Sequence, residues 1–106
     1  MFDFLLMFGI SIWVKGYNSF VATPISTKEE AQFRGHSIAQ KVYPNVDYKK
    51  FEVFTFSSKY AQNGDEIYCV RYGVPTDKPG CFDVATNDGT PAIDFKKSTG
   101  EIVWWK

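Results

Sequence analysis

The amino-terminal stretch constrains the fold of this chain more than any other feature. Every residue before Lys15 is uncharged except Asp3, and Phe, Leu, Ile, Met, Val and Trp make up most of the stretch. Exposing such a segment to water is unfavourable, because apolar surface is more stable when it is removed from solvent. It must therefore be buried in a protein core, in a bilayer or against a partner.

Two of the interpretations of this segment involve targeting. A membrane span needs about 20 apolar residues, whereas the run is interrupted at Lys15 and reaches that length only if it continues to Ala22. A cleaved secretory signal begins with positive charges, but here Asp3 is the only charge near the start. Cleavage is therefore the least favoured interpretation, and a membrane anchor over residues 2–22 stays open.

In the third interpretation the segment is part of the folded domain. Ile10, Ile12 and Val14 alternate with other side chains, a period of two that is typical of a β-strand. Residues 10–21 would then form the first strand of a sheet. We therefore divide the chain into an apolar segment, residues 1–22, which is a first strand, a core element or an anchor, and an α+β domain, residues 23–106. A cytoplasmic location and a membrane or envelope location both stay open.

Length and charge restrict the class of protein. At 106 residues the chain forms one domain with a single modest core. Twelve Lys and Arg residues balance twelve Asp and Glu residues, so the net charge is zero. A nucleic-acid-binding domain usually carries a basic patch, and we expect no nucleic-acid partner.

The residues suited to metal or cofactor chemistry are few. Cys69 and Cys81 are the only cysteines and His36 is the only histidine, too few for a zinc site at this spacing. The two cysteines form either a disulfide or two unrelated buried thiols. Because the chain has neither a phosphate-binding glycine loop nor a dinucleotide fingerprint, we expect no cofactor and no metal.

The clearest local signal predicts a helix that starts near residue 27. Ser26 with Glu29, or Thr27 with Glu30, fits a capping box, in which each side chain satisfies a backbone N–H of the first turn. An apolar stripe at helical spacing follows, formed by Ala31, Gly35, Ile38, Ala39 and Val42. Pro44 ends the helix. The small residues of this stripe would let the helix lie close to a sheet.

The remainder of the chain reads as a series of short strands. Residues 51–57, 66–73, 81–86, 91–96 and 101–105 are rich in β-branched and aromatic side chains, and turn sequences separate most of them. Short connections favour antiparallel neighbours. We therefore predict an α+β fold, with one helix packed on an antiparallel meander sheet of four or five strands.

The last hairpin carries a family resemblance. Residues 92–103 read Ala-Ile-Asp-Phe-Lys-Lys-Ser-Thr-Gly-Glu-Ile-Val, a strand, a Thr-Gly turn and a second strand that together resemble the last hairpin of PepSY-type domains and, more loosely, cystatin-type domains. This resemblance implies a non-catalytic domain that acts as an inhibitor or regulator. The Gln-Val-Val-Ala-Gly and Pro-Trp hairpins of cystatins are not present, so inhibition of papain-type proteases is not implied.

Aromatic residues point to a binding function. They make up 18% of the chain, and the strands are apolar on both faces, although one helix can cover only one face. We expect a non-catalytic protein-binding module, an inhibitor, immunity-type or regulatory domain. Its partner is another protein, such as a toxin or enzyme that it inhibits, or a second copy of the chain. The expected contact residues are the aromatics Trp104, Trp105, Tyr68, Tyr72 and Phe33.

Two other functions are weighed against this one. The first is a membrane-associated accessory subunit, anchored by residues 2–22. The second is a small hydrolase or nuclease that uses His36. We expect His36 to have a structural or solvated role, because its neighbour Ser37 points about 100° away around the helix and offers it no catalytic partner.

Overall fold

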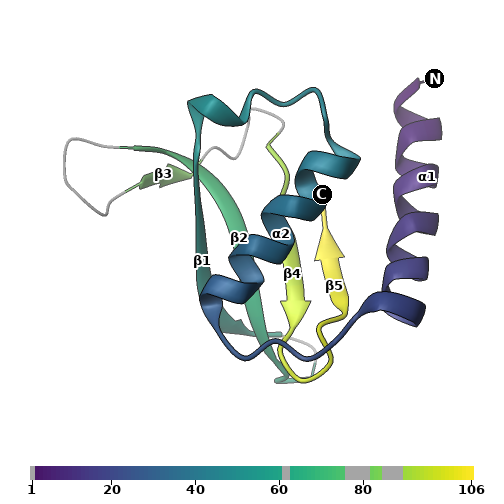
Figure 1. The fold of residues 1–106 in the computed structure, drawn as a ribbon, viewed down its shortest axis with the longest axis vertical. Helices are drawn as coiled ribbons and strands as arrows, with labels where there is room; N and C mark the ends of the chain where they lie inside the picture. Colours follow the sequence, from purple (N-terminus) through teal and green to yellow (C-terminus); the bar gives the residue numbers. More distant parts are fainter. Residues whose placement is uncertain (1, 61–62, 76–81, 85–89) are drawn as a thin grey trace.

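The computed structural model describes residues 2–60, 63–75, 82–84 and 90–106. A helix, α1 (Phe2–Gly16), continues into one turn of π-helix, η1 (Tyr17–Val21). After an extended linker come α2 (Lys28–Val42), the 3₁₀ turn η2 (Tyr48–Lys50) and the strands β1 (Glu52–Lys59), β2 (Glu66–Pro75), β3 (Phe82–Val84), β4 (Ile93–Lys96) and β5 (Ile102–Trp105). Helix α2 lies across one face of the sheet, and α1 stands beside β5 (Figure 1).

The predicted α+β fold with an antiparallel sheet is confirmed. The strand order is β1-β2-β4-β5, and the short β3 pairs with the end of β2. All four pairings are antiparallel. Of the predicted third strand, residues 82–84 form β3, while residues 81 and 85–86 lie outside the described residues.

Helix α2 begins and packs as its sequence predicts. Thr27 is the N-cap, and its hydroxyl accepts a hydrogen bond from the Glu30 backbone N–H at 3.1 Å. The Glu30 carboxylate in turn accepts from the Ser26 N–H at 3.3 Å, which completes the capping pair. A Cβ atom at Gly35 would lie 2.9 Å from a methyl carbon of Val70, so the absence of a side chain brings this helix against β2.

The core lies between α2 and the facing side of the sheet. It contains the helix residues Ala31, Ile38 and Ala39 together with sheet residues of even number, Tyr68, Val70 and Tyr72. Ile93, Phe95 and Ile102 extend the same layer across β4 and β5. Because side chains alternate along a strand, Cys69 and Arg71 point to the opposite face of the sheet.

The interpretation of residues 10–21 as a first strand is wrong, because these residues are helical. Ile10, Trp13, Val14 and Tyr17 are spaced by 3, 4 and 7 residues, which puts them on one side of a helix. That side packs on the domain: Ile10 and Tyr17 are buried, and Trp13 and Val14 pack against the core. Tertiary packing on this stripe overrides the alternating pattern that favoured a strand.

Asn18 attaches α1 and η1, which we call the amino-terminal unit, to the sheet. Its side-chain amide donates to the carbonyl oxygen of Ile102 at 3.0 Å, and its side-chain oxygen accepts from the Ile102 N–H at 2.8 Å. The amide thus pairs with β5, the last strand in the sheet order, as the backbone of another strand would. No helix among the described residues is long and apolar enough to span a membrane.

Candidate functional site

The face of the sheet away from α2 carries a row of side chains that runs across four strands. In the strand register, Phe56 of β1 lies beside Cys69 of β2, Cys69 beside Asp94 of β4, and Asp94 beside Trp104 of β5. Arg71 and Phe54 form the next pair along β1 and β2. We call the group Phe54, Phe56, Arg71, Asp94 and Trp104 the aromatic face.

Arg71 joins the members of the aromatic face. Its guanidinium lies 5.2 Å from the centre of the Trp104 ring and 5.7 Å from that of Phe56. One of its nitrogen atoms lies 2.7 Å from a carboxylate oxygen of Asp94 and also donates to the Val70 carbonyl oxygen at 3.0 Å. Cation–π contacts and a charge-assisted hydrogen bond therefore fix the guanidinium between two rings.

The outer part of this face is open to solvent. Phe56 and Trp104 are each 41% exposed, whereas Asp94 beneath them is 8% exposed. Phe54 stacks near Phe56 with ring centres 6.3 Å apart. The face thus combines exposed aromatic area with a buried polar anchor, the composition that concentrates binding energy in protein interfaces.

Cys69 lies beneath this face and is 3% exposed. It is a free, buried cysteine, and burial, followed by the nearby Asp94, raises the pKa of its thiol to about 12 despite the opposing influence of Arg71. A thiol with a raised pKa forms little of the nucleophilic thiolate at neutral pH. Cys81 lies outside the described residues, so the choice between a disulfide and two separate thiols stays open.

His36 lies on the other side of the sheet, in a ring cluster with Tyr48 and Tyr72. Its Nδ1 is 2.7 Å from the Tyr72 hydroxyl oxygen, and its ring packs edge-on against Tyr48 with centres 5.4 Å apart. The Tyr48 hydroxyl donates to the carbonyl oxygens of Ala39 and Tyr43, both at 2.8 Å. The sheet thus separates His36 from Cys69, and the two do not form a nucleophile–base pair.

The structure divides the contact residues expected from sequence. Trp104 is on the aromatic face and Phe33 is 77% exposed on α2, so both are accessible. Trp105 is half-buried against the core. The expectation that Tyr68 and Tyr72 lie on an exposed surface is wrong: they are 7% and 3% exposed and face α2. Sequence alternation alone does not say which face of the sheet these two side chains point to. In the structure they share the core face with Val70.

Sequence reasoning missed Phe56 and Arg71 as parts of a site. The signal lay in β1 and β2: Phe54 and Phe56 alternate with the residues of the covered face, and so do Cys69 and Arg71. A single arginine inside an apolar strand needs a partner, since a charge is costly to bury alone. That partner is Asp94, which lies two strands later in the sequence but on the neighbouring strand of the sheet.

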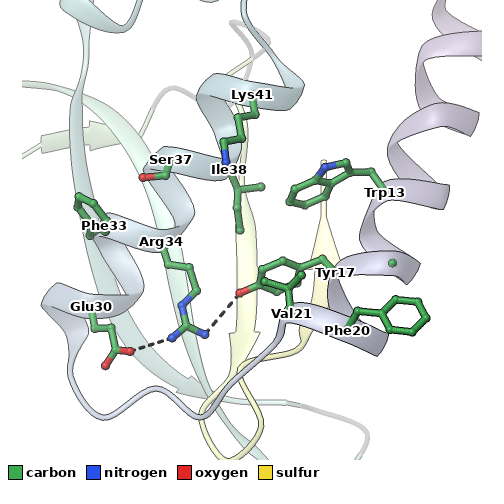
Figure 2. Close-up of a pocket in the computed structure, with 11 residues that line it drawn as sticks. Trp13, Tyr17, Phe20, Val21, Glu30, Phe33, Arg34, Ser37, Ile38 and Lys41 are labelled. Carbon is green, nitrogen blue, oxygen red and sulfur yellow. Dashed lines mark hydrogen bonds and ion pairs between the residues drawn. The ribbon is translucent and has the colours of Figure 1, made fainter.

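A groove between the amino-terminal unit and α2 forms a second candidate site. Its volume is about 720 Å³, and it is lined by Trp13, Gly16, Tyr17, Phe20, Val21, Glu30, Phe33, Arg34, Ser37, Ile38 and Lys41. Figure 2 shows the Trp13 and Tyr17 side chains projecting from the amino-terminal unit toward Ile38 and Arg34 of α2. We call this the helix groove.

Comparison with known proteins adds no assignment. No family model matches the chain, and neither a curated protein nor a solved structure matches it. Among the described residues, no group of three or more His, Cys, Asp and Glu side chains is placed to hold a metal ion.

Proposed function

We propose that this protein is a non-catalytic binding module that contacts another protein through the aromatic face. The observation that carries the proposal is the fixed position of Arg71 between the Phe56 and Trp104 rings, above the Asp94 carboxylate. A site whose side chains are already ordered loses little conformational entropy on binding. Trp and Arg are also the residue types that most often dominate interface energies.

The chemistry of the face suggests what it would bind. Asp94 accompanies the Arg71 charge, so the face offers aromatic area with little net charge. A partner surface of apolar side chains would be complementary to it, with a hydrogen-bond acceptor near the remaining N–H groups of Arg71. An inhibitor, an immunity-type protein or a regulatory domain would act in this way, by occupying a surface of its target.

The proposal is tested by binding to extracts of the native cells. The full-length chain is immobilised, and the retained proteins are compared between wild type, Trp104→Ala and Phe56→Ala. Loss of an aromatic anchor should reduce the retention of a specific partner by about 10- to 30-fold, equivalent to roughly 1.4–2 kcal/mol. Both residues are half-exposed, so the thermal midpoints of the variants should stay close to that of wild type.

Phe33→Ala is the matched control, because Phe33 is an exposed ring on α2 and lies outside the aromatic face. Equal retention by Phe33→Ala and wild type, with loss in the two face variants, supports the assignment. If both face variants retain every partner of the wild type, the aromatic face is not the binding surface.

A second candidate function rests on exposed apolar side chains of the amino-terminal unit. Ile12, Phe20 and Val21 are 57%, 90% and 61% exposed, an apolar surface that would suit attachment to a membrane interface. In this case the full-length chain resists extraction from native membranes by a carbonate wash, and the variant Ile12→Ser/Phe20→Ser is released. Release of the wild-type chain by the same wash would remove this candidate.

A further inference from the structure

We infer that the helix groove is a binding site for a single-chain amphiphile with an anionic head group. The inference is independent of the aromatic face, which lies on the other side of the sheet. It rests on the size of the groove, on its apolar lining and on the position at its edge of one cation, Lys41, that has no ion-pair partner among the described residues.

The size and the lining of the groove suit a small apolar ligand. Its volume of about 720 Å³ falls within the range of about 300–1,000 Å³ that is usual for small-molecule sites. The stacked rings of Trp13 and Tyr17, with centres 5.6 Å apart, and the buried Ile38 provide apolar walls. Phe20, Val21 and Phe33 also line the groove, although each is more than half exposed.

The polar residues at one end of the groove already satisfy one another. Arg34 lies 2.8 Å from the Glu30 carboxylate and donates to the Thr23 carbonyl oxygen at 2.7 Å. The same guanidinium is 3.4 Å from the Tyr17 hydroxyl (Figure 2). These contacts hold the amino-terminal unit against α2. They also leave few hydrogen-bonding groups at this end for a polar ligand group.

The other end of the groove is different. Lys41 and Ser37 line it on successive turns of α2, and Lys41 has no ion-pair partner among the described residues. Lys41 lines the groove together with the buried Ile38, which lies three residues before it on α2 (Figure 2). An anionic head group would pair with this ammonium while its hydrocarbon chain occupied the apolar groove, so charge and apolar area favour one class of occupant.

Binding to the purified full-length chain tests the inference with four twelve-carbon probes below the concentrations at which they form micelles. Dodecanoate and dodecyl phosphate are the anionic probes, and their relative affinity separates a carboxylate ligand from a phosphate ligand. Dodecanol and dodecyltrimethylammonium are the neutral and cationic counterparts. Calorimetric titration should give one saturable site for the anionic probes and weaker binding of the other two.

Lys41→Gln tests the head-group contact. It should weaken the binding of the anionic probes by about three- to fivefold, as expected for loss of one partly exposed ion pair, and leave dodecanol binding unchanged. Lys49→Gln is its control, because Lys49 is exposed and does not line the groove.

The double variant Val21→Ser/Phe33→Ser tests the apolar walls and should weaken all probes by about tenfold. Its control is Phe56→Ser, an exposed ring on the aromatic face. The substituted side chains are exposed, so folding, monitored by circular dichroism, should be unaffected.

Three results would overturn the inference. The first is the absence of saturable binding. The second is anionic binding that Lys41→Gln and the double variant leave unchanged. The third is dimerisation in sedimentation experiments that the double variant abolishes while the probes do not bind, which would assign the groove to a second copy of the chain.

Discussion

At the scale of single residues, the contact between Arg71 and Asp94 pairs two opposite charges within the aromatic face. The side chains of both are mostly covered, and their charged atoms lie 2.7 Å apart. Asp94→Asn would leave the guanidinium, which lies between two aromatic rings, without its counter-charge. We expect a loss of about 1.5–3 kcal/mol in the free energy of unfolding, the range for a hydrogen bond to a charged group, measured by urea denaturation.

The comparison variant is Asp65→Asn, which removes a more exposed pair. Asp65 lies 3.2 Å from Lys96, and about a third of each side chain is accessible. Exposed pairs contribute at most about 1 kcal/mol. If the two substitutions destabilise the protein equally, the coverage of the Arg71–Asp94 pair has no energetic consequence.

Among the secondary-structure elements, the junction between η1 and β5 depends on Asn18. Removing its amide with Asn18→Ala would leave the N–H and the carbonyl oxygen of Ile102 without their partner on this side. We expect the free energy of unfolding to fall by about 1–3 kcal/mol and the Ile102 amide to exchange faster with deuterated solvent. Ser19→Ala, at the exposed neighbouring position, should change neither value; normal protection of Ile102 in Asn18→Ala would contradict this role.

The elements also show what local sequence patterns can predict. Helix α2 and the hairpins β1-β2 and β4-β5 follow from a capping pair, an apolar stripe and turn residues, all of which act over a few positions. The helical geometry of the amino-terminal unit does not follow from local sequence patterns. The same stretch shows both the alternation of Ile10, Ile12 and Val14 and the helical spacing of Ile10, Val14 and Tyr17. Contact with the domain, which is remote in sequence, selects the helix.

Only part of the aromatic face is predictable from local sequence. Trp104 follows from its residue type and its place in the last predicted strand, although alternation alone does not say whether Trp104 or Trp105 faces away from α2. Arg71 and Phe56 come together through the register of β1 with β2, and Asp94 and Trp104 join them through the pairings with β4 and β5. No short window of sequence specifies these registers. Tyr68 and Tyr72 are of a residue type that is common at interfaces, but their register places their side chains in the core.

At the scale of the whole molecule, stability should depend on alkaline pH. Burial, followed by the neighbouring Tyr43, raises the pKa of Tyr48 to about 12, and burial also raises the pKa of Tyr72 above its usual value. The Cys69 pKa is raised to about 12 as well. These groups lose their protons at lower pH in the unfolded chain than in the folded one, so rising pH favours unfolding.

The stabilisation that the protonated tyrosines and Cys69 give the folded state is fully present below about pH 9 and falls as the pH rises from there toward 12. Urea denaturation midpoints measured from pH 7 to pH 11 should be constant at first and then decline. The decline should be smaller in Tyr48→Phe, which cannot ionise at that position. A midpoint that stays constant or rises up to pH 11 would contradict the protonated state of this cluster.

The central claim is that the aromatic face touches a partner protein, and site-specific photo-crosslinking in the native cells tests it most directly. The photoreactive residue p-benzoylphenylalanine replaces Phe56 in one full-length variant and Phe33 in another, since both positions are exposed. Irradiation should give an adduct of one discrete mass, containing another protein, from position 56 and none of that mass from position 33. Adducts from position 33 alone, or none from position 56, would contradict the claim.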